Sequence, residues 1–173
     1  MGAWRRAGSQ WSVGSLAAIA ALACGGLSGC THSVLVSDAS VTKGTIVCAV
    51  VSRVDRLVIT RSSAKSARFT FPAEITVTDP RRVRTIARAL CALPVMPRGT
   101  FHCPAEFAIS YRLIFAVGGR TLKPVAVLAS GCQEVYGLGR ARWVALSPGF
   151  WRIMGAVAGI RDARYSTLRG PIT

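Results

Sequence analysis

Residues 111–119 read YRLIFAVGG, and this stretch decides the fold. Apolar side chains occupy every second position of its first part: Tyr111, Leu113, Phe115 and Val117. That period predicts a β-strand with one face toward a core. The glycines at 118–119 accept a positive φ without steric cost and predict a tight hairpin turn. Residues 121–129 return as the second strand, which Pro124 places at a sheet edge or interrupts with a bulge.

Five further segments predict strands. Residues 54–61 and 74–78 alternate between the two faces, as half-buried strands do. Residues 44–51 are apolar and rich in β-branched side chains, which favours a strand, with a fragment of helix as the alternative. Residues 68–71 and 142–146 are shorter candidates.

Two segments predict helices. Asp79 can cap a helix, and Pro80 fits the first turn because its missing N–H has no partner there. Apolar residues then recur with helical spacing at Val83, Ile86, Ala87 and Leu90, until Pro94 ends the helix. Ser147 and Pro148 predict the start of a second helix in the same way. Its apolar side consists of Phe150, Trp151, Met154, Val157 and Ala158.

The order of these elements predicts an α+β fold. We expect a single antiparallel β-sheet packed against two α-helices and stabilised by disulfides. The length of 173 residues allows one domain, and a hydrophobic content of 51% excludes a fully disordered chain.

Catalytic candidates are few. The 7 acidic residues are scattered, and neither a Gly-x-Ser-x-Gly elbow nor a glycine-rich phosphate loop occurs. His102 adjoins Cys103, but neighbouring side chains of an extended segment point to opposite faces and cannot form a thiol dyad. Without a Cys-x-x-Cys or a histidine pair, no metal site is expected. We therefore expect no enzyme activity and no cofactor.

The N-terminus has the layout of a secretory signal peptide. Arg5-Arg6 precede an apolar, uncharged run at 11–23. Residues 27–30 then read LSGC, which resembles a bacterial lipobox. That resemblance implies cleavage just before Cys30 and a diacylglycerol on its sulfur. The open alternatives are lipidation at Cys24, an ordinary signal peptide and an uncut membrane anchor.

This interpretation divides the chain into four parts. Residues 1–29 form the signal peptide and 30–44 a lipid-anchored tether; 45–160 form the α+β domain and 161–173 a loose basic tail. The protein is then expected on the extracytoplasmic face of the cell membrane. Disulfides persist in that oxidising compartment.

Four cysteines remain after Cys24 and Cys30 are set aside. Cys103 and Cys132 flank the predicted hairpin, whose antiparallel strands bring their outer ends together, so we expect a bridge between them. Cys48 and Cys91 form a possible second bridge, although Cys91 can also be a small buried hydrophobe.

The charge is strongly basic, with 22 Lys and Arg against 7 acidic residues. Arg81, Arg84 and Arg88 share the polar face of the first predicted helix and form a candidate surface for anionic lipid headgroups or cell-wall polymers. The competing explanation is compositional, because 19 of the basic residues are arginine. Nucleic acid is not expected as a partner outside the cell.

Short motifs carry a resemblance to a known group of proteins. They are Asp79-Pro80, the run from Ala89 to Pro94, Cys103-Pro104, the run from Tyr111 to Phe115, and Gly131-Cys132. Over about residues 54–158 the chain resembles uncharacterised secreted actinobacterial proteins, many of them lipoproteins. The resemblance implies the same α+β domain and the same bridge but brings no site.

A weaker resemblance covers about residues 80–132. A helix ending in Ala-Leu, a Cys-Pro, a hairpin and a closing cysteine are similar to the subtilisin inhibitor-like family of secreted protease inhibitors. The resemblance implies a protease-binding loop with its cleavable bond between Ala105 and Glu106. Glutamate past the bond is a departure from that family, and its other disulfide has no clear counterpart here.

We therefore expect a lipid-anchored, non-catalytic binding or accessory domain in the cell envelope. Its expected partners are the membrane, an anionic lipid or polymer, and an unidentified protein. A protease inhibitor that uses the loop after Cys103 is the alternative.

Overall fold

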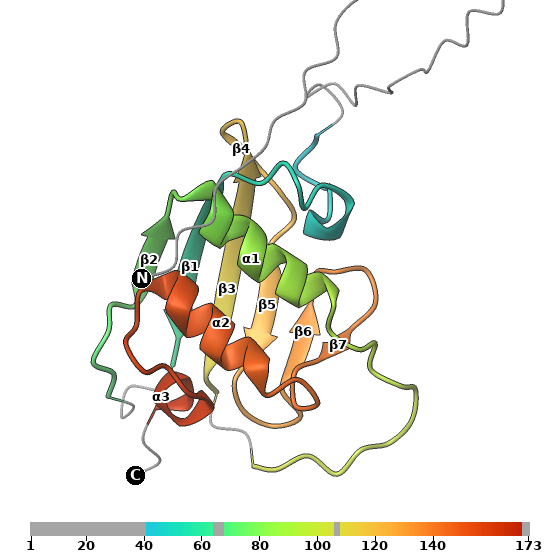
Figure 1. The fold of residues 1–173 in the computed structure, drawn as a ribbon. Helices are drawn as coiled ribbons and strands as arrows, with labels where there is room; N and C mark the ends of the chain where they lie inside the picture. Colours follow the sequence, from blue (N-terminus) through green and yellow to red (C-terminus); the bar gives the residue numbers. More distant parts are fainter. Residues whose placement is uncertain (1–40, 64–67, 106–107, 171–173) are drawn as a thin grey trace, which may run out of the picture. The chain divides into compact units, whose positions relative to one another are not determined.

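A computed structural model describes residues 41–63, 68–105 and 108–170, all within the compact unit 36–173 (Figure 1). Its sheet has seven strands, and every pairing is antiparallel. Six follow the order β2-β1-β3-β5-β6-β7, and β4 pairs with β3. The strands are β1 (Arg56–Ser62), β2 (Glu74–Val77), β3 (Ser110–Val117), β4 (Arg120–Thr121), β5 (Val125–Leu128), β6 (Glu134–Tyr136) and β7 (Arg142–Trp143). The predicted single antiparallel sheet is confirmed.

The predicted hairpin forms the middle of the sheet. All four alternating apolar residues of β3 are buried. Gly118 and Gly119 have φ of 53° and 81°, as the predicted tight turn requires. Ala116 pairs with Thr121, whereas Leu113 pairs with Val125, so one extra residue lies in the returning strand. This is a bulge at Pro124, and β6 covers the outer side of β5, so the strand is not an edge.

Two long helices lie side by side over the sheet (Figure 1). In α1 (Pro80–Cys91), Asp79 Oδ1 accepts from the N–H of Arg81 at 2.8 Å, which confirms the predicted cap. Its four predicted apolar residues are all buried. In α2 (Gly149–Ala158), the Ser147 side chain makes no capping bond, so the predicted serine cap is wrong; its carbonyl oxygen instead accepts from the N–H of Phe150 at 2.9 Å.

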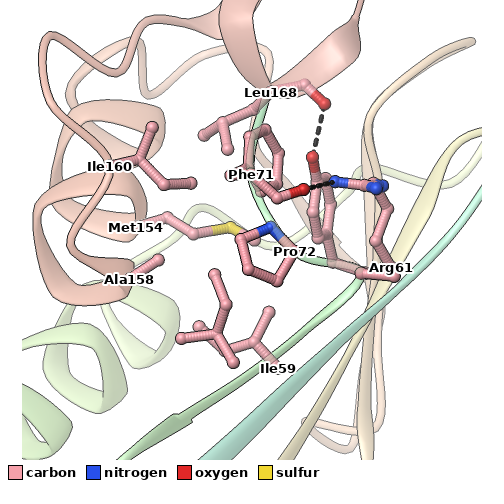
Figure 2. A pocket seen from close by; sticks show the side chains of 11 residues that line it. Ile59, Arg61, Phe71, Pro72, Met154, Ala158, Ile160 and Leu168 are labelled. Atoms are coloured by element: carbon pink, nitrogen blue, oxygen red, sulfur yellow. Dashed lines mark hydrogen bonds between the residues drawn. The ribbon is translucent and has the colours of Figure 1, made fainter. Parts of the chain in front are cut away.

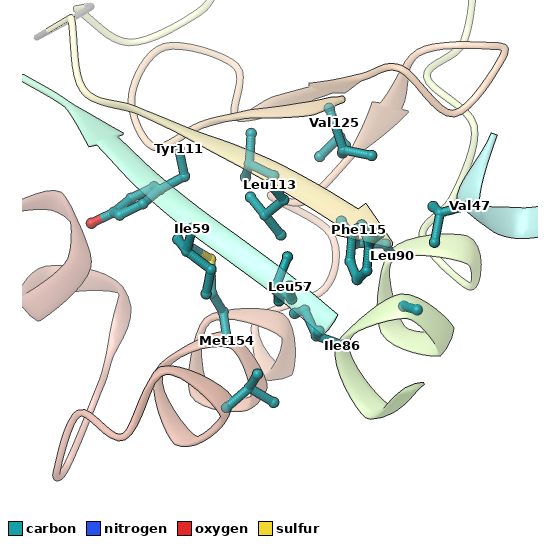
Figure 3. Packing of buried hydrophobic residues seen from close by; sticks show 14 of the residues in the cluster. Val47, Leu57, Ile59, Ile86, Leu90, Tyr111, Leu113, Phe115, Val125 and Met154 are labelled. Atoms are coloured by element: carbon teal, nitrogen blue, oxygen red, sulfur yellow. The ribbon is translucent and has the colours of Figure 1, made fainter. Parts of the chain in front are cut away.

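One apolar core joins these helices to the sheet (Figure 3). Leu57 pairs with Phe115 and Ile59 with Leu113, and all four side chains are buried. Side chains from α1 and α2 complete this core; among them are Ile86, Leu90, Trp151 and Met154. The apolar faces predicted from sequence spacing therefore meet in one cluster.

Two predicted strands are wrong. Residues 44–51 contain a short 3₁₀-helix, η2 (Val47–Ala49), whose Val47 packs in the core. Here a disulfide to α1 and burial outweigh the β preference of branched side chains, which depends on sheet context. Residues 68–71 form no strand, because the segment turns so that Phe69 and Phe71 can pack against the core. Conversely, the three-residue β6 was not predicted.

The C-terminal residues 161–170 are not a loose tail. They include a third helix, α3 (Tyr165–Arg169), whose Leu168 is fully buried. The Tyr165 hydroxyl donates to the Ala129 carbonyl oxygen at 2.9 Å, which ties α3 to the end of β5. A Cβ at Gly155 would lie 1.9 Å from that of Ala163, so only glycine allows α2 to approach this segment. Packing that is distant in sequence thus orders a segment whose composition alone suggests mobility.

Candidate functional site

The three arginines proposed as a basic face do not act alike. Arg81 and Arg88 are exposed on α1, and neither has a carboxylate partner among the described residues. Arg84 is half-buried, and its Nε donates to the carbonyl oxygen of Val54 at 3.3 Å. Arg84 therefore links α1 to the segment before β1, and only the other two remain available to a partner.

Arg82, which sequence reasoning missed, also has a structural contact. Its Nη2 lies 2.6 Å from the carbonyl oxygens of both Ala156 and Val157, at the C-terminal end of α2. The free carbonyls of a helix end carry partial negative charge, so a guanidinium there is stabilising. This contact also places the N-terminus of α1 beside the C-terminus of α2, which makes the pair antiparallel.

Thr85 of α1 and Ala156 of α2 line the same groove as Arg81. Arg88 lies one helical turn after Thr85, and Arg152 lies one turn before Ala156, so both arginines border this surface. Two open grooves of about 270 and 220 Å³ follow the seam between the helices. Ile153 lines both grooves. We call this surface the helix-pair face; it comprises Arg81, Thr85, Arg88, Ala89, Arg152, Ile153 and Ala156.

A larger groove lies between β2 with its preceding loop and the segment after α2. Its volume is about 620 Å³, and Glu74 and Arg161 lie among its lining residues. Beneath it, Figure 2 shows an apolar pocket closed by Phe71 and Pro72, with Met154 and Ile160 opposite. The free space inside is about 10 Å³, roughly one water molecule, so this lower pocket is filled by the protein itself.

The polar groups of the lower pocket bind other parts of the chain. The Arg61 guanidinium lies 3.7 Å from the ring centre of Phe69 and donates to the Phe71 carbonyl oxygen at 3.2 Å. The Tyr111 hydroxyl donates to the Leu168 carbonyl oxygen (Figure 2). Burial raises the pKa of Tyr111, and the positive charge of Arg61 opposes that rise. Tyr111 therefore stays neutral and serves as a hydrogen-bond donor that holds α3.

Both predicted disulfides are present. Cys103 bonds to Cys132, and Cys48 bonds to Cys91 with a Cα–Cα distance of 5.6 Å. Cys91 is therefore a bridge partner as well as the last residue of α1.

The loop of the inhibitor hypothesis is partly described. Pro104 and Ala105 are exposed directly after the bridged Cys103, and the Phe101 ring lies 5.4 Å from that of Trp143. Glu106 lies outside the described residues.

Cys30, the proposed lipidation site, also lies outside the described residues.

The described residues contain no group of three or more His, Cys, Asp or Glu side chains placed to bind a metal ion. None of their helices has the length and apolar character needed to cross a bilayer.

Comparisons with protein-family models, with curated proteins and with solved structures found no match to this chain.

Proposed function

We propose that this protein is a cell-envelope lipoprotein, cut before Cys30 and held on the extracytoplasmic face of the membrane by lipid on that cysteine. The observation that carries the proposal is the sequence LSGC at 27–30, directly after a positive start and an apolar run. Two disulfides support it, because they persist in an oxidising compartment.

The domain beyond the tether is proposed to bind a partner or to assist one rather than to catalyse a reaction. The domain has two open surfaces: the helix-pair face on α1 and α2, and the groove beside β2. The four described cysteines are all in disulfides, and the Tyr111 hydroxyl donates to a backbone carbonyl oxygen. These contacts suit a rigid binding module.

Intact-mass spectrometry of the chain from bacterial membranes tests the anchor. We expect a mature protein that begins at Cys30 and carries the mass of a diacylglycerol. Cys30→Ser is expected to lack the lipid and to leave the membrane fraction, whereas the matched variant Cys24→Ser keeps both properties. An unmodified Cys30 in the wild-type chain, or lipid on Cys24, would contradict the proposed anchor.

Protease inhibition is the second candidate function, and one observation favours it. Pro104 and Ala105 are exposed, and the bridge from Cys103 to Cys132 fixes the start of their loop to the connection between β5 and β6. Fixing a loop before binding lowers the entropy lost on association.

Titration of subtilisin-type and trypsin-type proteases with the purified protein tests this second candidate. An inhibitor is expected to abolish activity at one equivalent, and Ala105→Pro to abolish the inhibition. Full protease activity at a large excess of the protein would remove this candidate.

A further inference from the structure

We propose that the helix-pair face is the surface by which the domain lies against an anionic lipid bilayer. The proposal deepens the proposed function and rests on it in one respect: the lipid anchor keeps the domain close to the membrane. It replaces the arginine triad expected from the sequence with a different set, Arg81, Arg88 and Arg152.

Charge complementarity is the first support. All three arginines are exposed, and none has a carboxylate partner among the described residues. The acidic residue nearest to Arg81 in the sequence is Asp79, whose Oδ1 accepts a hydrogen bond from the backbone N–H of Arg81 as a helix cap. The helix-pair face itself contains no acidic residue. Three free guanidinium groups thus share one surface that the fold leaves uncovered within the described residues.

The apolar side chains between these arginines favour lipid over a soluble polymer. Ile153 is half-exposed at the seam, where the two grooves meet, and Ala89 and Ala156 flank it. An acidic polymer would need only the charges, whereas a bilayer interface also accepts apolar groups beneath its headgroups. Arginine suits this position because its planar fork binds a phosphate through two donors at once.

Not every arginine near this face is available to bind a lipid headgroup. Arg82 is held by the end of α2 and Arg84 by the Val54 carbonyl, so neither is free for a headgroup. Each free arginine near an anionic surface strengthens binding by about fivefold. The three together are expected to shift the balance between docked and undocked domain by roughly 100-fold, an effect that salt weakens.

The test uses the full chain reconstituted in vesicles that contain a trace of photoactivatable phospholipid with the reactive group in the headgroup. On vesicles with about 30% phosphatidylglycerol, crosslinks are expected mainly in peptides from 80–91 and 149–158. On vesicles of phosphatidylcholine alone, those crosslinks are expected to fall by about tenfold or more.

A matched pair of variants separates the surface from the net charge. The triple variant R81Q/R88Q/R152Q is expected to lose the helix crosslinks on anionic vesicles. The control R56Q/R112Q/R140Q removes the same charge from exposed positions elsewhere and is expected to retain them. Arg56 and Arg112 alternate with the core-facing residues of β1 and β3 and so lie on the opposite face of the sheet.

Three outcomes would overturn the proposal. The first is crosslinks spread evenly over the domain, and the second is an equal loss of the helix crosslinks in both variants. The third is a helix-pair face that soluble polyglutamate protects but that the lipid in anionic vesicles does not label. The last outcome would assign the face to an acidic polymer. Failure of the lipid anchor is measured separately by flotation, because a chain without the lipid does not float with phosphatidylcholine vesicles. Labelling on anionic vesicles can still be measured in that case.

Discussion

Replacing Trp151 with alanine is expected to lower the free energy of unfolding by about 4 kcal/mol. Trp151 is 2% exposed, and its ring centre lies within 5.5 Å of those of Phe150 and Tyr165 and 6.4 Å from that of Tyr111. Its Nε1 donates to Gln133 Oε1 at 3.0 Å. One side chain thus joins α2, β3 and α3, and its truncation leaves a large cavity between them.

Trp143 offers a matched control for this substitution. It is half-buried in β7, and its ring packs on Phe101. Trp143→Ala is expected to cost less than about 2 kcal/mol, because less apolar surface leaves the protein interior. Urea unfolding followed by far-ultraviolet circular dichroism measures both variants without relying on tryptophan fluorescence. Equal losses in the two variants would contradict the central role assigned to Trp151.

Removing the bridge between Cys48 and Cys91 is expected to cost a similar amount. The two cysteines are 43 positions apart, and closing a loop of that length stabilises a fold by about 4 kcal/mol in the chain-entropy model. The bridge ties η2, and so the entry of the chain into the domain, to the last turn of α1. Cys48→Ala/Cys91→Ala therefore removes the covalent link between these two elements.

The second bridge is the natural comparison, because Cys103 and Cys132 are only 29 positions apart. Its removal is expected to cost about 3.5 kcal/mol, slightly less than the first. Together the two losses approach the whole stability of a typical domain, which is about 5–15 kcal/mol. Thermal unfolding with and without dithiothreitol measures the combined effect. A reduced protein that melts at the temperature of the oxidised one would contradict both estimates.

Local signals predicted much of the fold. The cap at Asp79, the spacing of apolar residues in α1 and the alternation in β3 each depend on residues within a few positions of one another, and all three are confirmed. Where distant packing decides, prediction failed. Residues 44–51 look like a strand until η2 is bridged to α1, and residues 161–170 look mobile until Tyr111 and Tyr165 fix them.

The candidate binding surface was likewise predicted only where local sequence spacing determines it. The sequence placed Arg81, Arg84 and Arg88 on one side of a helix, which is correct as geometry. It could not reveal that Arg84 donates a hydrogen bond to the Val54 carbonyl oxygen, or that Arg152 of α2 lies on the same surface. Both facts depend on how α1 and α2 pack, and no spacing within one helix encodes that arrangement.

The arginines that bind backbone carbonyls have a consequence for acid resistance. Arg61, Arg82, Arg84 and Arg142 each connect separate segments through a carbonyl oxygen, not a carboxylate. Acidification unfolds proteins mainly by protonating carboxylates that are bonded in the native state, and a carbonyl takes up no proton in that range. A guanidinium also keeps its charge there. A domain joined in this way is expected to keep these connections when its surroundings turn acidic.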